Sequence, residues 1–406
     1  MRKLTLALAL LIAMTAGAKT KTQTIEITNT LETKRVDAPV NVSLSKVPFA
    51  VRQAVVKING QEIPCQLDDL TGDGTADVLC FLVNMDAKQA VTAEVSYSDN
   101  GVQKDYPARV YVDMMLTNKK IKESNKQDLY IDQLTVNRGT NPYNQLHHHG
   151  AAFESELAAY RIYFDHRQTV DIYGKYSKQL ELKQTQFYPD AQQKAAGFGD
   201  DVLWVGNTLG VGTLRGFDGN GPVMLEDLDH RSQRIVAKGP IRTIVEVKDD
   251  NWLPAPGAEK VTMITYYTLY AGHRDCEVSC VFSRPTSNNY CTGIINVKDS
   301  KEYSDNNGLR GCWGTDWPVS EKDSAGHKRE TVGLGICIPK KNVVRELPAN
   351  KDNYAYAVTT KDCTLNYGIV FGSDNETFGF HSADAWFAYL QEWKREVENP
   401  LKVRIK

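Results

Sequence analysis

The densest group of side chains able to do chemistry lies between His147 and Lys175. It contains the adjacent histidines His147, His148 and His149, followed by Glu154, Glu156, Tyr160, Arg161, Tyr173 and Lys175. A histidine beside a carboxylate can move protons near neutral pH. An arginine can hold a substrate carboxylate through two parallel hydrogen bonds, and a tyrosine can protonate a leaving oxygen. Together these residue types could support proton transfer on an acidic substrate.

The same segment also has a purely structural interpretation. The histidine triplet could be a solvated loop, with Glu154 and Arg161 as an ion pair. If the triplet lies on a strand, His147 and His149 face one way and His148 the other. A metal site is disfavoured, because no HExxH or comparable ligand spacing occurs.

Three further segments are weaker candidates. His230 and Arg231 end an acidic stretch that is either a loop or a contribution to a site from across a sheet. Trp313 and Trp317 offer aromatic faces on which a sugar could stack, or else belong to the core. The loop with Asp69, Asp73 and Asp77 resembles a calcium loop, but Cys80 stands where an EF-hand needs a carboxylate. No metal is therefore predicted, with these three aspartates as a weak calcium candidate.

Strands must position most of these residues. Polar and apolar residues alternate in residues 24–28, 40–44 and 91–97, and Asn59-Gly60 is a strong hairpin turn. Residues 109–129 are lysine-rich and predict an exposed connection. Long strand-like stretches follow in meander order, which indicates an antiparallel sheet. Residues 383–398 have a helical pattern. Residues 151–164 could form either an amphipathic helix or one strand with Glu154, Glu156 and Tyr160 on one face, and their composition favours the strand.

Composition limits the protein class. With 406 residues the chain is long enough for two domains, and a net charge of −2 without a basic stretch argues against nucleic-acid binding. None of the eight cysteines shows CxxC spacing, and several lie in apolar strands, which favours buried thiols. If a disulfide forms, Cys65 with Cys80 is the pair to test first.

The first 18 residues have the features of a cleavable signal peptide. Arg2 and Lys3 supply positive charge, residues 4–14 form an apolar run too short for a bilayer, and residues 16–18 are small. No cysteine follows that run directly, so no lipid anchor is expected. The prediction is an exported protein, periplasmic or secreted, without a membrane anchor.

Several motifs resemble one known family. They are Asn29-Thr-Leu with Arg35 and Ala38-Pro-Val40, the loop of residues 66–74, and above all residues 147–156, 159–163 and 171–175. They resemble a family of exported Bacteroidota proteins, found among polysaccharide-degradation enzymes and long described as a domain of unknown function. That family includes an ulvan oligosaccharide dehydratase. The resemblance implies a mostly β fold, with a small N-terminal β-sandwich (residues 19–108) before a large antiparallel galactose-mutarotase-like β-supersandwich (residues 109–406).

The resemblance implies carbohydrate chemistry, and the residues suggest how it would proceed. The leading hypothesis is a dehydratase, a carbon–oxygen lyase that removes water across C4 and C5 of a non-reducing-end uronic acid in an oligosaccharide, without a cofactor. The expected roles are His148 or His149 as base, Arg161 as carboxylate partner, Tyr173 or Tyr160 as acid, and Glu154 orienting the histidine. The expected substrate-binding residues are His147, Glu156, Lys175, His230, Arg231, Trp313 and Trp317.

Two alternatives stay open. A glycoside hydrolase or sugar epimerase on the same fold could use Glu154 and Glu156 as paired carboxylates. A non-catalytic glycan-binding protein could use Trp313 and Trp317. The sequence leaves the glycan and the oligomeric state undetermined.

Overall fold

A computed structural model describes residues 17–360 and 362–406. The predicted signal peptide therefore lies almost entirely outside the described residues. Within the described part, no helix is long and apolar enough to cross a membrane.

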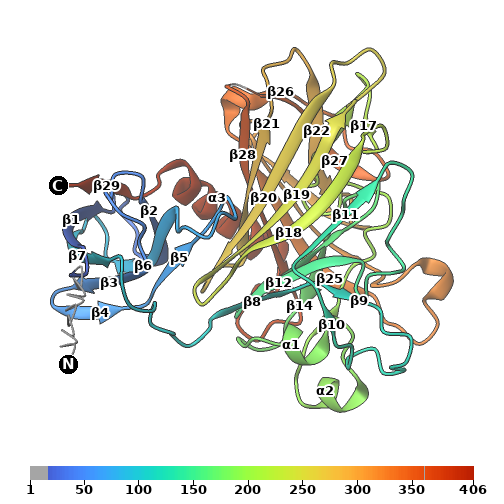
Figure 1. Cartoon of the computed structure of the whole chain (residues 1–406). Coiled ribbons are helices and arrows are strands. Elements are labelled where there is room, and N and C mark those ends of the chain that lie inside the picture. Colours follow the sequence, from blue (N-terminus) through green and yellow to red (C-terminus); the bar gives the residue numbers. More distant parts are fainter. Residues whose placement is uncertain (1–16, 361) are drawn as a thin grey trace, which may run out of the picture.

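The N-terminal part consists of two facing antiparallel sheets (Figure 1). One has the order β29 (Lys402–Ile405), β1 (Thr20–Thr28), β7 (Ala90–Ser98), β3 (Gln53–Ile58) and β4 (Gln61–Ile63). The other has the order β2 (Arg35–Ser43), β6 (Val78–Met85) and β5 (Cys65–Asp68). Alternate residues such as Ile25, Ile27 and Val95 fill the core between them. The predicted strands and the Asn59-Gly60 hairpin are confirmed.

A nine-stranded antiparallel sheet is the centre of the larger part. Its order is β11 (Gln133–Asn137), β18 (His230–Lys238), β19 (Arg242–Trp252), β20 (Val261–Tyr270), β21 (Asp275–Phe282), β28 (Thr364–Ser373), β25 (Glu330–Cys337), β24 (Leu309–Asp316) and β23 (Lys301–Ser304). Consecutive strands β18 to β21 are hydrogen-bonded neighbours, as the meander order predicted.

Two five-stranded sheets form the opposing layer. The first has the order β15 (Asp200–Asp201), β14 (Val170–Gly174), β13 (Ala159–Tyr163), β12 (Gly150–Ser155) and β8 (Val110–Asp113). The second has the order β17 (Pro222–Val223), β16 (Arg215–Phe217), β22 (Asn289–Ile295), β27 (Asn353–Thr359) and β26 (Val343–Glu346), and a short pair joins β10 (Leu129–Tyr130) to β9 (Met115–Leu116). Residues of both layers form one continuous hydrophobic core. The mostly β, antiparallel fold class is confirmed.

The helix α3 (Ala383–Glu398) covers the outer face of the nine-stranded sheet, as Figure 1 shows, and matches its predicted range. Ser382 caps its first turn by accepting the Ala385 N–H. Trp386 and Leu390 pack so closely on the sheet that a Cβ at Gly333 or Gly335 would overlap them. The remaining helices are short: α1 (Leu182–Thr185), α2 (Ala191–Ala195) and the 3-10 turns Glu321–Asp323 and Lys340–Asn342.

Three local predictions are corrected. Residues 151–164 are two strands, because the turn at residues 156–158 reverses the chain between β12 and β13. Residues 109–129 begin with strand β8 and two fully buried methionines, so only their later, lysine-rich half is an exposed connection.

The suggested Cys65–Cys80 disulfide is also wrong. Cys65 lies opposite Phe81 and Gln66 lies opposite Cys80, so the two thiols point to opposite faces of one sheet. All eight cysteines fall within the described residues and are free thiols, seven of them buried, which confirms the buried-thiol interpretation.

Candidate functional site

Two rows of side chains cross the outer face of the first five-stranded sheet. The strand register places Asp113, Ala152, Arg161 and Asp171 directly opposite one another on β8, β12, β13 and β14. The next row contains Tyr111, Glu154, Ala159, Tyr173 and Asp201, from β8 to β15. Because alternate strand residues share a face, both rows point away from the main core.

The segment of residues 181–188, which includes α1, closes over this face. Leu182 and Phe187 pack against Ala152, Ala159 and Tyr173. The two alanines leave the space that Phe187 occupies, and its ring lies 4.0 Å from the Arg161 guanidinium carbon. The covering segment thereby delivers the next residue, Tyr188, to the edge of the sheet.

Arg161 is at the centre of the cluster. Its Nε and Nη2 donate to Asp171 Oδ2 at 2.8 and 2.6 Å, and Nη2 also reaches Asp201 Oδ2 at 2.9 Å. Its Nη1 donates to the Tyr188 hydroxyl at 3.2 Å. Burial disfavours the charge, but Asp171 and its neighbours outweigh burial and keep the pKa of Arg161 well above its usual value.

The histidine triplet lies in a turn before β12 rather than on a strand. The strand on which its side chains would alternate is therefore not formed, and the triplet lies in a loop. The His147 ring contacts both the His148 ring and the Tyr188 ring. His149 adopts a left-handed conformation with a φ of 71°. That turn sends its ring onto Tyr143, with which it stacks at a centroid distance of 3.7 Å.

The hydrogen bonds of His149 define its tautomer. Its Nδ1 lies 3.0 Å from the carbonyl oxygen of Tyr143, which can only accept, so Nδ1 carries the proton. In the neutral ring Nε2 therefore keeps its lone pair, and it lies 3.4 Å from the Tyr188 hydroxyl. Burial lowers the pKa of His149 to about 4, so the ring is neutral at pH 7. The neutral ring with a lone pair on Nε2 is the state in which a histidine can accept a proton as a general base.

His148 and His147 are placed differently. His148 is buried, and its Nε2 contacts Asp113 Oδ1 at 2.8 Å, while Tyr111 donates to the other oxygen of Asp113. His147 is half-buried, and burial lowers its pKa to about 4. Its Nε2 has no hydrogen-bond partner among the described residues.

A rim of side chains, the buried Tyr163 and the half-buried Tyr143, Arg167 and Asp201, lies around the His149–Tyr188 contact. The Arg167 guanidinium lies 4.5 Å from the Tyr143 ring and 4.9 Å from the Tyr163 ring, and its Nε donates to Asp165. Tyr163 donates to Asp171 Oδ2 at 2.8 Å. Asp201 completes the rim, and burial together with the Asp171 charge raises its pKa despite the nearby Arg161.

Four of the predicted residues are buried hydrogen-bonding partners beneath or beside this cluster. Glu154 pairs with Lys175 at 2.5 Å and accepts the backbone N–H groups of Glu181 and Leu182. Lys175 also donates to the carbonyls of Ser155 and Gln179. The hydroxyls of Tyr160 and Tyr173 donate to the Arg274 carbonyl and to Glu181. None of these four is more than 1 % exposed.

The other predicted residues lie elsewhere. Glu156 bonds to Arg109 and to the Gly272 N–H, beside the N-terminal part. Arg231 is buried and pairs with Asp249, and His230 is exposed at the start of β18. Trp313 packs against α3. The side chains of Asp69, Asp73 and Asp77 accept backbone N–H groups of their own loop.

Trp317 lies in a separate pocket of about 520 Å³ together with Trp204. The backbone N–H of Trp204 donates to the backbone carbonyl of Trp317 at 2.8 Å. Trp204 is 44 % exposed and lies three residues after Asp201, so the pocket and the Arg161 cluster contain residues that are close in sequence.

The predicted set lacked several residues of the cluster: Tyr188, Tyr143, Arg167, Asp201, Asp171, Tyr163, Asp113 and Tyr111. Arg167 lay within the dense polar stretch, but Tyr188 and Asp201 come from segments without any motif. Only the pairing of β14 with β15 and the closure of residues 181–188 bring them to Arg161. Among the described residues, no group of three or more His, Cys, Asp or Glu side chains could hold a metal ion.

Comparison with known proteins gives a family and several distant structural matches. The model of a family described as "Domain of unknown function (DUF4861)" matches residues 27–403. No curated protein matches the chain. Two of the matching solved structures, both at 10 % identity, are a protein in the glycosyl hydrolase family 38 from Enterococcus faecalis, with a TM-score of 0.45, and an alpha-mannosidase from Enterococcus faecalis V583, with a TM-score of 0.44. Each match covers 95 % of this chain but only 47 % and 46 % of the other, so the chain spans about half their length.

Proposed function

The chain belongs to the DUF4861 family, a family of unknown function, and we propose that it is an exported carbohydrate dehydratase whose site is the Arg161 cluster. The proposed substrate is an oligosaccharide that ends in a uronic acid. The observation that carries the proposal is the position of one hydroxyl, that of Tyr188, between the lone pair of His149 and the guanidinium of Arg161.

Removal of water across C4 and C5 needs a base and an acid. In the proposed step, His149 Nε2 takes the C5 proton, a double bond forms between C5 and C4, and the C4–O bond breaks. Tyr188 gives its proton to the departing oxygen, which leaves as water. The proton on His149 then returns to the tyrosinate across their 3.4 Å contact, so both groups end as they began.

The two arginines have different proposed roles. Arg161 is 4 % exposed and donates to Asp171, Asp201 and Tyr188, so its proposed role is that of a positioning residue that stabilises the tyrosinate. Arg167 is half-buried at the rim and its charge acts on His149, so it is the proposed partner of the substrate carboxylate. Neutralising that carboxylate makes the C5 proton more acidic.

A second candidate, glycan binding without catalysis, is favoured by the pocket that contains Trp204 and Trp317. Paired-carboxylate hydrolysis has less support, because Glu154 and Glu156 bond to different partners, Lys175 and Arg109.

The test is incubation with oligosaccharides that end in a uronic acid with a free C4 hydroxyl. A dehydratase produces ultraviolet absorbance from the new conjugated double bond and a product lighter by one water in mass spectrometry. Tyr188→Phe should lower kcat/KM by about 100-fold or more, the range for loss of a general acid. Tyr176→Phe, a half-buried tyrosine that makes none of the cluster's contacts, is the matched control. A product heavier by one water would favour hydrolysis, and binding without any product would favour the second candidate.

A further inference from the structure

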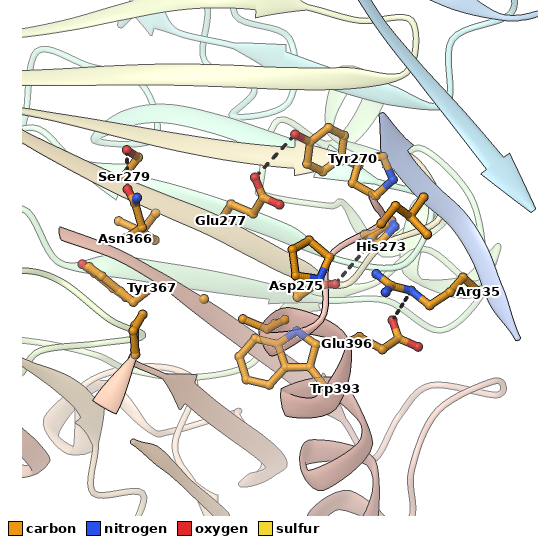
Figure 2. Close-up of a pocket in the computed structure, with 17 residues that line it drawn as sticks. Arg35, Tyr270, His273, Asp275, Glu277, Ser279, Asn366, Tyr367, Trp393 and Glu396 are labelled. Atoms are coloured by element: carbon orange, nitrogen blue, oxygen red, sulfur yellow. Dashed lines mark hydrogen bonds and ion pairs between the residues drawn. The ribbon is translucent and has the colours of Figure 1, made fainter. Parts of the chain in front are cut away.

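A cavity of about 490 Å³ lies at the junction of the N-terminal part, the nine-stranded sheet and the end of α3 (Figure 2). Its floor is the outer face of β21 and β28, whereas the Arg161 cluster lies on the outer face of the opposing layer. The cavity has the size of sites for small molecules, which are concave and carry a few convergent polar groups.

The floor and the walls differ in character. Asp275, Glu277 and Ser279 alternate along β21, so they share the face that borders the cavity, and Ser279 donates to Asn366 on β28 at 2.7 Å. The walls are largely apolar and include Trp393 of α3, Pro39 of β2, Pro400 and Leu401. Such a floor and walls match a ring with polar substituents on one side.

The charges that line the cavity do not cancel. Arg35 pairs with Glu396 at 3.4 Å, and His273 pairs with Asp275 at 3.0 Å. Glu277 has no cation within ion-pair distance among the described residues, and its only hydrogen bond there comes from the Tyr270 hydroxyl at 3.4 Å. Desolvation by the atoms around the cavity and the neighbouring Asp275 charge raise the pKa of Glu277, while its side chain stays exposed to the cavity. One carboxylate is therefore left in excess.

A second polar group also lacks a normal partner. The Trp393 side chain is 3 % exposed, and its indole N–H makes no hydrogen bond of normal geometry to any described residue. It lies near enough to Asp275 to help His273 lower the pKa of that carboxyl against the effect of burial. A buried donor without a partner costs free energy, which an acceptor on a ligand would recover.

We propose that this cavity is a second ligand site that takes a six-membered ring bearing a primary ammonium group. The ammonium pairs with Glu277, hydroxyl groups on the ring reach Ser279 and Asn366, and the ring lies against the apolar wall. Amino sugars and arylmethylamines such as benzylamine both carry an ammonium group, and only the amino sugars also have hydroxyl groups for the polar floor. The site is independent of the dehydratase chemistry, because the excess negative charge disfavours a uronate.

The test is titration calorimetry of the full chain with ligands that differ only in charge. At a pH where the amine is protonated, glucosamine should bind at least about tenfold more tightly than glucose, a difference of about 1.4 kcal/mol, and glucuronate should bind more weakly still. Benzylamine against benzyl alcohol repeats the comparison without ring hydroxyls. Tighter binding of benzylamine than of glucosamine would assign the site to arylmethylamines.

Glu277→Gln should remove the preference for glucosamine over glucose, and this exposed residue can be replaced without disturbing the core. Glu226→Gln, at an exposed loop position before β18, is the matched control and should leave the preference unchanged. Equal affinity for the three sugars, or a preference that survives Glu277→Gln, would overturn the proposal.

Discussion

The chemistry of the candidate site depends on the Tyr188 hydroxyl, which contacts both Arg161 and His149. Burial raises the pKa of Tyr188, and Arg161 opposes that effect. Tyr188 is therefore protonated at neutral pH, as an acid must be, while Arg161 can stabilise the anion that remains after the proton leaves. His149 has the opposite property, because burial lowers its pKa and keeps the ring unprotonated, as a base must be before it accepts a proton. Two neighbouring groups whose environments separate their pKa values are the usual basis for assigning an acid and a base.

This assignment predicts the acidic limb of the pH profile. His149 is active only when unprotonated, and its pKa is about 4, so kcat/KM should rise as the pH increases through about 4 and then stay level to neutral pH. The measurement is kcat/KM for the dehydration against pH. An ordinary histidine would instead place this limb near pH 6.5. A limb at that higher value would argue against a buried His149 as the base.

The two arginines should separate kinetically. Arg161→Lys keeps a charge but loses the planar contacts to Asp171, Asp201 and Tyr188, so kcat should fall by about 100-fold with little change in KM. Arg167→Lys should instead raise KM, because its proposed contact is made to the substrate. Steady-state kinetics of both variants is the measurement. A raised KM with unchanged kcat in Arg161→Lys would instead make Arg161 the residue that binds the substrate carboxylate.

The sequence could identify part of this site and not the rest. His149 and Arg161 stand in a stretch of residues whose types suggest proton transfer. Tyr160 and Tyr173 were attractive as acids only because they are close in sequence to the histidines. Both are buried and donate to fixed protein partners, so Tyr188 is the better candidate for the acid. Tyr188 lies 27 residues from Arg161 in sequence, and its contact requires a folded cover over the sheet. Local patterns carry no record of such a contact.

Strands and the helix were easier to predict than their partners. Alternation identified β1, β7 and the β3–β4 hairpin, and the pattern of Trp386, Leu390 and Trp393 identified α3. Strands β12 to β14 do not alternate, because α1 and its flanks bury their outer face as well as their inner one. The turn between β12 and β13 was missed for that reason.

One buried ion pair, Glu154 with Lys175, helps to hold the cover over β12 to β14, because Glu154 also accepts two backbone N–H groups of the cover. Lys175→Met would leave the Glu154 carboxylate buried without its cation, which should lower the free energy of unfolding by about 3–5 kcal/mol. Adding Glu154→Gln should cost less than the sum of the single variants, because the uncompensated charge is gone. Chemical denaturation measures all three.

Lys238→Met is the matched control, since the Lys238–Asp132 pair is more than half exposed on both sides and contributes little. Strictly additive effects of Glu154→Gln and Lys175→Met would show that the pair does not act as a unit.

The two parts of the molecule are joined at several places far apart in sequence. Strand β29, at the end of the chain, pairs with β1 in the N-terminal sheet. Arg109 bridges Asp37 of β2 and Glu156, and Arg242 of β19 pairs with Asp68 of β5. Charged residues so distant in sequence give no sign of their pairing until the strands are placed. The junction is therefore a feature of the folded chain alone.

His273 makes this junction sensitive to pH. Its Nε2 contacts the Asp37 carbonyl at 2.9 Å and its Nδ1 contacts Asp275 at 3.0 Å, so only the charged ring can donate to both. Burial opposes that charge, but Asp275, the Asp37 carbonyl and Glu277 outweigh it and raise the pKa of His273 to about 9.

A raised pKa in the folded state gives stability that is complete below the unfolded value of 6.5 and is lost as the pH rises through about 9. The contribution is on the order of 3 kcal/mol, because the side chain is 16 % exposed and little screened. Free energies of unfolding should therefore fall between these two pH values in the wild type and fall by less in His273→Gln. His381→Gln, which removes a histidine that is 59 % exposed, should keep the wild-type slope. An equal slope in His273→Gln and the wild type would mean that this ring is not the group through which the junction responds to pH.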